Sequence, residues 1–230
     1  LRLVGGVDRA VGVVRLAAGR ALAIAEADVT GASDIWLLQL DARGKITADT
    51  HVRRKGKQRV HAYHFSQGRR SGKLWIGGRS GTAGFLEAFD TSGASKGAVK
   101  AKLPGPVLAL APARRGALWV VGRRSNGKGW FGILSRKGRF KLQKRFKPSL
   151  PKGARVTLLP GRRGATMWVR APGRLGTAWL AKLGQRGRLK GKATLSSGGA
   201  TGVNVVLPAG KRALVALGAA EGCGRGLLDG

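Results

Sequence analysis

Cysteine is almost absent from this sequence: Cys223 is the only one among 230 residues. A single thiol cannot form an intramolecular disulfide, and no second cysteine stands beside it to complete a zinc site. Neither kind of cross-link therefore stabilises the fold. Long apolar runs are missing too, since no stretch approaches the roughly 18 residues of a membrane-spanning helix.

Acidic residues are scarce. The chain has 10 Asp and Glu against 44 Lys and Arg, a net charge of +34, and no carboxylate side chain lies between Asp90 and Glu221. A chain of this charge repels itself and concentrates polyanions around it. We therefore expect an anionic partner. The alternative is that the charge serves solubility, or reflects a genome biased towards Arg, Gly and Ala.

Disorder is excluded by the apolar content. Hydrophobic residues make up 43% of the chain, enough to bury a core that offsets the entropy of ordering. The chain begins at Leu1 and shows no signal peptide, which favours a processed chain exported to the periplasm or the extracellular space. The cysteine count leaves the compartment open.

An internal repeat runs through the chain. Four segments align without a gap: DIWLLQLDARG (34–44), AGFLEAFDTSG (83–93), KGWFGILSRKG (128–138) and TAWLAKLGQRG (177–187). The aligned aromatics are Trp36, Phe85, Trp130 and Trp179, and a glycine follows each of them eight residues later. Spacings of 49, 45 and 49 residues between the aromatics identify a structural repeat.

A second set of aromatics precedes the first. Trp75, Trp119 and Trp168 lie ten or eleven residues before the next aligned aromatic. Each apolar run is bounded by Gly, Ser, Pro or Arg and is rich in residues that favour strands. No segment has a long helical period. The chain is predicted to be all-β.

The third repeat shows the expected unit most clearly. It predicts four strands, at 106–112, 117–124, 130–136 and 140–146, joined by glycine-bearing turns. Four antiparallel strands repeated every forty-odd residues are typical of a β-propeller blade. The inner strands are the most apolar and the outer one is charged, so we expect the tryptophans to pack between adjacent blades.

The repeat count predicts one β-propeller domain, residues 1–230, with five blades of about 46 residues. The expected blades are 7–59, 60–104, 105–153, 154–199, and 200–230 completed by 1–6. In this arrangement the N-terminal strand LRLVGG supplies the outer strand that the fifth blade lacks. Such a closure leaves no open sheet edge.

The pattern ALWVVGRRSNGKGWFGILSRKGR (117–139) resembles the loosely defined bacterial β-propeller repeat, and the resemblance covers nearly all of the chain. Such repeats carry D-x-x-G at the third turn, which DARG (41–44) and DTSG (90–93) retain and SRKG and GQRG lose. The resemblance implies a binding platform or scaffold, often outside the cytoplasm. It implies no particular ligand.

Basic residues recur in phase at the predicted turns. The first and third turns of an antiparallel blade lie on the same rim, where guanidinium and ammonium groups can bind phosphate, sulfate or carboxylate. The predicted polyanion-binding residues are Arg69, Arg70, Arg114, Arg115, Arg136, Lys137, Arg139, Arg162, Arg163, Arg186, Arg188, Lys211 and Arg212. The alternative is that these turns merely solvate their charges.

Catalysis has little support in the sequence. Most carboxylates are expected at turns, where they cap the chain, and no Ser-His-Asp order or activated nucleophile is evident. His61 and His64 are predicted to lie on opposite faces of one strand, so they do not suit one metal ion. No helix follows a glycine-rich loop. We expect no enzyme activity, no metal and no cofactor.

Two functions remain. The first is a scaffold that binds polyanions, whether nucleic acid through its backbone charge alone, acidic glycan or lipopolysaccharide. The second is a structural subunit of a larger protein or ribonucleoprotein assembly, docked on acidic partners. We rank the polyanion scaffold first.

Overall fold

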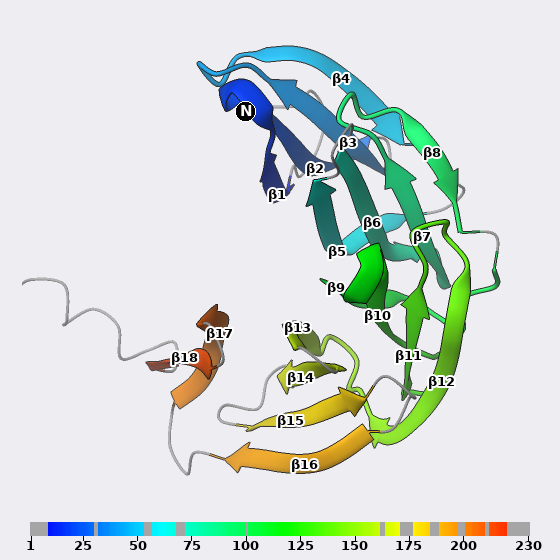
Figure 1. Ribbon diagram of the computed structural model, residues 1–230, viewed down its shortest axis with the longest axis vertical. Coiled ribbons are helices and arrows are strands. Elements are labelled where there is room, and N and C mark those ends of the chain that lie inside the picture. Colours follow the sequence, from blue (N-terminus) through cyan, green and yellow to red (C-terminus); the bar gives the residue numbers. More distant parts are fainter. Residues whose placement is uncertain are drawn as a thin grey trace, which may run out of the picture. The chain divides into compact units, whose positions relative to one another are not determined.

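The computed structural model describes residues 9–29, 32–52, 57–67, 72–99, 101–161, 164–170, 177–184, 189–196, 201–209 and 212–219. Within these ranges the chain is all-β, as predicted (Figure 1). Its helical content is two single 3₁₀ turns, η1 (Ala17–Gly19) and η2 (Arg114–Gly116). None of the described helices is long and apolar enough to span a membrane.

Each repeat forms a separate sheet. The first contains β1 (Arg9–Arg15), β2 (Ala21–Val29), β3 (Ala32–Leu40) and β4 (Ile46–Val52). The second contains β5 (Gln58–Gln67), β6 (Gly72–Ser80), β7 (Ala83–Phe89) and β8 (Ser95–Ala98). The third contains β9 (Val107–Pro112), β10 (Leu118–Arg123), β11 (Lys128–Leu134) and β12 (Phe140–Ser149).

The fourth sheet contains β13 (Arg155–Gly161), β14 (Gly164–Arg170), β15 (Thr177–Gly184) and β16 (Leu189–Ser196). A last pair is formed by β17 (Thr201–Ala209) and β18 (Arg212–Ala219). In every sheet the strands follow chain order, and paired strands run antiparallel. The predicted four-stranded antiparallel sheets are thus confirmed.

The predicted strands of the third repeat are correct to within two residues, except that β12 continues to Ser149, three residues beyond the predicted end. β11 ends at Leu134 rather than at residue 136, because Ser135 opens a turn: its N–H donates to the Arg139 carbonyl, 2.8 Å away. Arg136 is therefore a turn residue and not the last residue of a strand.

The chain divides into two compact units, residues 1–110 with 135–139 and residues 111–134 with 140–230. The predicted single domain, its blade boundaries and the ring closure stay predictions. The strand predicted at residues 1–6 lies outside the described residues, as does the segment after Ala219.

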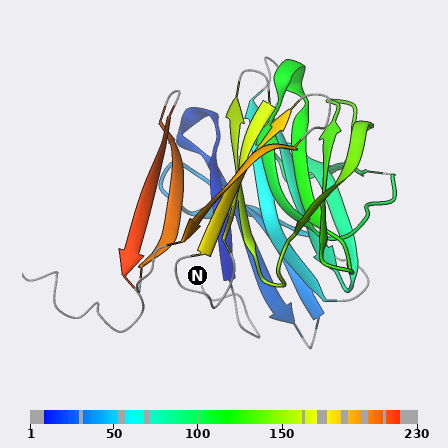
Figure 2. The ribbon, with the colours of Figure 1, turned by 90° about the horizontal axis from the view of Figure 1, so that it is seen from below.

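In the first unit, the first two sheets share one apolar core. Leu22 and Leu37 from the first sheet and Leu74 and Ile76 from the second have no exposed surface and belong to a single buried cluster. Figure 2 shows the strands of these two sheets lying roughly along one axis, with the blue η1 turn at the upper end of its strands. The strands that carry these turns are therefore anchored in a shared buried core.

The second unit has an aromatic core. Trp130 and Phe131 of β11 are completely buried and Trp119 of β10 is 3% exposed. The Trp119 ring lies 6.3 Å from Phe131, centroid to centroid, and Phe140 meets Trp130 edge-on at the same distance. These are ordinary geometries for aromatic pairs. Trp119 and Trp130 thus supply core packing in this unit.

Candidate functional site

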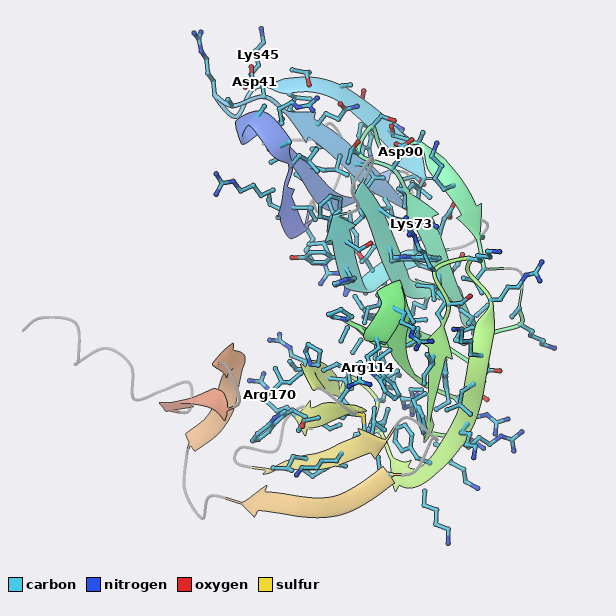
Figure 3. The ribbon with its side chains drawn as sticks, viewed as in Figure 1. Asp41, Lys45, Lys73, Asp90, Arg114 and Arg170 are labelled. Atoms are coloured by element: carbon cyan, nitrogen blue, oxygen red, sulfur yellow. The ribbon has the colours of Figure 1, made fainter. Side chains whose placement is uncertain are left out.

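The turn between β3 and β4 is fixed by one carboxylate. Asp41 Oδ1 accepts the backbone N–H groups of Arg43 and Lys45, each at 2.9 Å, and the Asp41 carbonyl accepts the N–H of Gly44 at 3.1 Å. Gly44 has a φ of 78°, in the left-handed region that favours glycine. The D-x-x-G motif therefore fixes the backbone, while the Lys45 side chain extends away from the sheet (Figure 3).

The turn between β7 and β8 repeats this geometry around Asp90. Its Oδ1 accepts the N–H groups of Ser92 and Ala94, at 2.9 and 3.0 Å, and Lys96 Nζ lies 2.8 Å from its Oδ2. Partial burial of the Asp90 carboxyl opposes ionisation, but hydrogen bonds from Lys96, Ser92 and Ala94 outweigh it and lower its pKa from 3.8 to about 2. The basic residue next to this turn, Lys96, is thus neutralised by an ion pair within the same sheet.

Substituting Asp90 by serine is expected to lower the free energy of unfolding by about 1 kcal/mol at pH 7, allowing for solvent screening of the partly exposed pair. A lowered pKa means that the stabilisation is complete above pH 3.8 and is lost as the pH falls through about 2. The difference between wild type and Asp90→Ser in urea unfolding should therefore shrink between pH 5 and pH 2. A difference that stays constant would show that the carboxylate is not the stabilising group.

The turn between β11 and β12 keeps the backbone shape without the acid. Ser135 Oγ accepts only the N–H of Arg139, at 3.1 Å, while Gly138 keeps the left-handed φ of 78°. The turn is seated on the second sheet, since Lys73 Nζ donates to the Arg136 carbonyl at 3.4 Å. Arg136, Lys137 and Arg139 thus occupy a turn that has lost its carboxylate.

The turn between β9 and β10 displays Arg114 and Arg115 on the 3₁₀ turn η2, closed by a 2.8 Å hydrogen bond from the Ala113 N–H to the Ala117 carbonyl. Arg115 has a left-handed φ of 58°, which costs a non-glycine residue about 1 kcal/mol or more. Ala18 in η1 has the same conformation, with a φ of 57°. The strain is therefore a property of this turn type. Arginine is tolerated at this position, although glycine would adopt the same φ with less strain.

The described rim cations have no acidic partner. Ion pairs between described residues join Arg9 and Arg59 to Glu26, His51 to Asp49, and Lys96 to Asp90. None of them involves the rim residues that the structure describes in full, which are Arg114, Arg115, Arg136, Lys137 and Arg139. Arg114 and Arg115 belong to the second unit, and the 135–139 turn belongs to the first.

Most of the other predicted binding residues are not among the residues that the structure describes. Outside the described residues lie Arg69, Arg70, Arg162, Arg163, Arg186, Arg188 and Lys211. Arg212 is the first residue of β18, so it begins a strand instead of occupying a turn. The structure therefore describes the predicted basic turns completely in the third repeat alone.

The expectation that most acids lie at turns is wrong. Of the seven acids that the structure describes, only Asp41 and Asp90 lie in turns. Glu26, Asp34 and Glu87 are buried within strands, with 4%, 7% and 8% of their surface exposed. Each interrupts or adjoins an apolar run, as in IAEA and FLEAF. This is the signal that could have identified them, because an acid inside such a run must find a partner elsewhere in the fold.

A shallow hollow of about 350 Å³ lies in the first unit and is lined by Thr50, His51, Val52, Glu87, Phe89, Ser95 and Ala98. The Ser95 hydroxyl donates to the Glu87 carboxylate, and His51 Nε2 lies 3.2 Å from Asp49 Oδ2. A hydroxyl that donates to a carboxylate without an intervening imidazole is not a serine triad. The hollow can accommodate a small polar group.

The histidines lie on two strands, His51 on β4 and both His61 and His64 on β5. Burial lowers the pKa of His64, which lies opposite Trp75 in the ladder. Within the described part of the chain, no group of three His, Cys, Asp or Glu side chains could hold a metal ion.

The sequence matches no known protein family and no curated protein. Solved structures do resemble it. A protein of unknown function from Bacteroides caccae is 14% identical, with a TM-score of 0.47 over 81% of this chain and 67% of that one. Dihydro-heme d1 dehydrogenase NirN in complex with DHE is 10% identical, with a TM-score of 0.54 over 82% of this chain and 38% of NirN.

This chain thus spans well under two thirds of the length of NirN. At 10% identity the likeness concerns the fold alone. Taken with the four-stranded antiparallel sheets in chain order, it indicates a β-propeller-like fold.

Proposed function

We propose that this chain is a non-enzymatic, cofactor-free scaffold that binds polyanions through the basic turns of one rim. The observation that carries the proposal is the complete lack of carboxylates in the described part of the second unit: no Asp or Glu occurs from residue 91 to residue 220. The arginines and lysines of that part therefore have no acidic side chain within it. A folded surface with this composition needs external counterions, and polyanions supply them at the lowest entropic cost.

Rigid display of the cations supports the proposal. The β9–β10 and β11–β12 turns are each closed by backbone hydrogen bonds of 2.8 Å, so the arginine backbones are already ordered before a ligand arrives. Pre-ordering lowers the entropy cost of binding. The loss of Asp at Ser135 removes the one carboxylate that would have neutralised the β11–β12 turn.

The proposed architecture is a five-bladed ring. The sheets recur with the 45 to 49 residue spacing of the repeat, and the last strand pair, β17 and β18, would begin a fifth blade. We propose that residues 1–6 complete the fifth blade as its outer strand. The first and third turns of all blades, including those that carry Arg69, Arg70, Arg162, Arg163, Arg186 and Arg188, would then form one basic rim.

A charge-matched pair of variants tests the proposed rim. The rim variant carries Arg114→Ser, Arg115→Gly, Lys137→Ser and Arg139→Ser. The control carries Lys141→Ser, Lys144→Ser, Arg145→Ser and Lys147→Ser, all on exposed positions of β12. Each variant lowers the net charge from +34 by four, to +30. The two variants therefore remove the same amount of charge from different places.

Binding to duplex DNA, single-stranded RNA, a sulfated glycan and lipopolysaccharide is measured over a range of salt concentrations. The rim variant should bind the preferred ligand at least about tenfold more weakly and reduce the slope of log K against log salt by about 2 to 4. The control variant should change both the affinity, as log K, and the slope by less than half as much. Equal losses in both variants would mean that bulk charge, and not the rim, binds polyanions. Tight binding retained by both would favour the alternative, a subunit docked on acidic partners.

A further inference from the structure

A second basic cluster lies at the opposite ends of the strands from the rim turns. Arg59 near the start of β5 lies directly opposite Arg79 near the end of β6 in the antiparallel ladder. Like charges placed directly opposite each other destabilise a sheet. Each arginine keeps solvent access, since 43% of the Arg59 side chain is exposed and Arg79 is exposed as well. The pair therefore presents two guanidinium groups on one patch of surface.

One buried carboxylate holds the cluster in place. Glu26, whose side chain is 5% exposed, accepts two hydrogen bonds of 3.0 Å from Arg9 and lies 3.7 Å from Arg59 Nε. It also accepts the backbone N–H of Val60. Arg9 in turn donates to the Val60 carbonyl at 2.8 Å. This frame spans β1, β2 and β5, so the base of the cluster is fixed across two sheets.

The cluster has an excess of positive charge. Three guanidinium groups, from Arg9, Arg59 and Arg79, face the single negative charge of Glu26, which leaves a local charge of +2. Among the described residues Arg79 has no acidic partner. Two positive charges that no side chain neutralises match the charge of one dianion.

A histidine completes the cluster. His61 is the extra residue of a β-bulge between Val60 and Ala62, so it is released from the ladder next to the arginines. Desolvation and the charge of Arg79 lower its pKa to about 4, with smaller effects of Arg9 and Arg59 in the same direction and of Glu26 in the opposite one. At neutral pH the ring is therefore uncharged and can still donate one N–H.

We propose that Arg59, Arg79 and His61 bind a single tetrahedral oxyanion of the phosphate class, either free phosphate or a phosphomonoester. Directly opposite residues of an antiparallel ladder are about 4.5 to 5.5 Å apart at Cβ, which suits two guanidinium groups on one phosphate. This geometry favours one phosphate group over an extended polymer, and the site is independent of the proposed rim.

The test follows the three histidine rings of the full chain by NMR during titration with inorganic phosphate and, separately, with phosphoserine at constant ionic strength. Saturable shifts are expected for His61, while His51 and His64 serve as internal controls in the same spectrum. A bound dianion should also raise the His61 pKa by about one unit or more, because a nearby negative charge favours the imidazolium.

Arg79→Ser should weaken phosphate binding by about tenfold or more, since it removes a charge-assisted hydrogen-bonding group from an exposed position. Lys144→Ser on β12, which also removes one exposed positive charge, should leave it unchanged. The proposal is overturned if phosphate shifts all three histidines alike, or if the two variants weaken binding equally. Stronger binding of phosphoserine than of phosphate would identify a phosphomonoester as the ligand, and the reverse would identify free phosphate.

Discussion

Replacing Trp130 by alanine is expected to lower the free energy of unfolding by about 3 to 5 kcal/mol. The Trp130 side chain has no exposed surface, and it lies in the central strand pair of the third sheet, opposite Gly122 on β10 and Arg145 on β12. Phe140 packs edge-on against it. Alanine would leave a cavity of several methylene groups in a core that has few alternative ways to repack.

Phenylalanine at the same position is expected to cost less than about 1.5 kcal/mol, although it too is smaller than tryptophan. The Trp130 indole N–H is buried and has no hydrogen-bond partner among the described residues. Removing that donor relieves a desolvation cost, which offsets part of the lost packing. The second repeat already has Phe85 at the equivalent position, 6% exposed, so the blade accepts a phenyl ring there.

Urea is the suitable denaturant for this comparison, since guanidinium salt would also screen the +34 charge. Unfolding curves of wild type, Trp130→Ala and Trp130→Phe at one salt concentration give the two differences directly. Similar costs for alanine and phenylalanine would mean that the indole is bound by specific contacts that the structure does not show. A negligible cost for alanine would mean that Trp130 is not in a packed core.

Much of the fold follows from short-range sequence features. The aligned aromatics and glycines predict the sheets because the aromatics occupy equivalent strand positions, buried at Phe85, Trp130 and Trp179, and the described glycines occupy the same left-handed turn position. Gly44, Gly93 and Gly138 all have φ values between 78° and 80°. Burial of the aromatic and the left-handed turn at the glycine both depend on neighbouring residues, so the sequence repeat alone is enough to predict them.

The acids and the bulges could not be predicted in the same way. Glu26 finds its partners on β1 and β5, and the Val60 N–H that it accepts is 34 residues away. The bulge that releases His61 arises from pairing between β5 and β6 and leaves no mark in the alternation of residues. These features depend on which distant strands pair and in which register, and the pattern of residues in a single sequence does not specify that pairing.

The two candidate sites differ in the same way: one depends on neighbouring residues in a turn, the other on pairing between strands. The paired arginines at 114–115 were identified because turn residues are local, and the structure places both on η2. The Arg59–Arg79 pair was missed because its members are 20 residues apart and meet only through the ladder. The two sites differ in kind: rim turns display cations that no described acid touches, whereas the strand-end cluster is built around a buried carboxylate.

That carboxylate is the second position where a large effect is expected. Glu26→Ala should lower the free energy of unfolding by about 3 kcal/mol, because it leaves the buried Val60 N–H without an acceptor and removes the bidentate partner of Arg9. Glu26→Gln should cost about half as much, since the amide oxygen can still accept from Val60. The free energies are measured by urea unfolding at neutral pH.

A double-mutant cycle separates the Glu26 ion pair from the backbone hydrogen bond. Arg9→Ala alone should cost less than Glu26→Ala, because 45% of the Arg9 side chain is exposed and the carboxylate keeps its other partners. The coupling energy between the two substitutions should be about 1 to 2 kcal/mol. A coupling near zero, together with a cost below about 1 kcal/mol for Glu26→Ala, would show that Glu26 does not hold the first two sheets together. A coupling of the expected size would mean that Arg9 and Glu26 act as a pair in holding the first two sheets together.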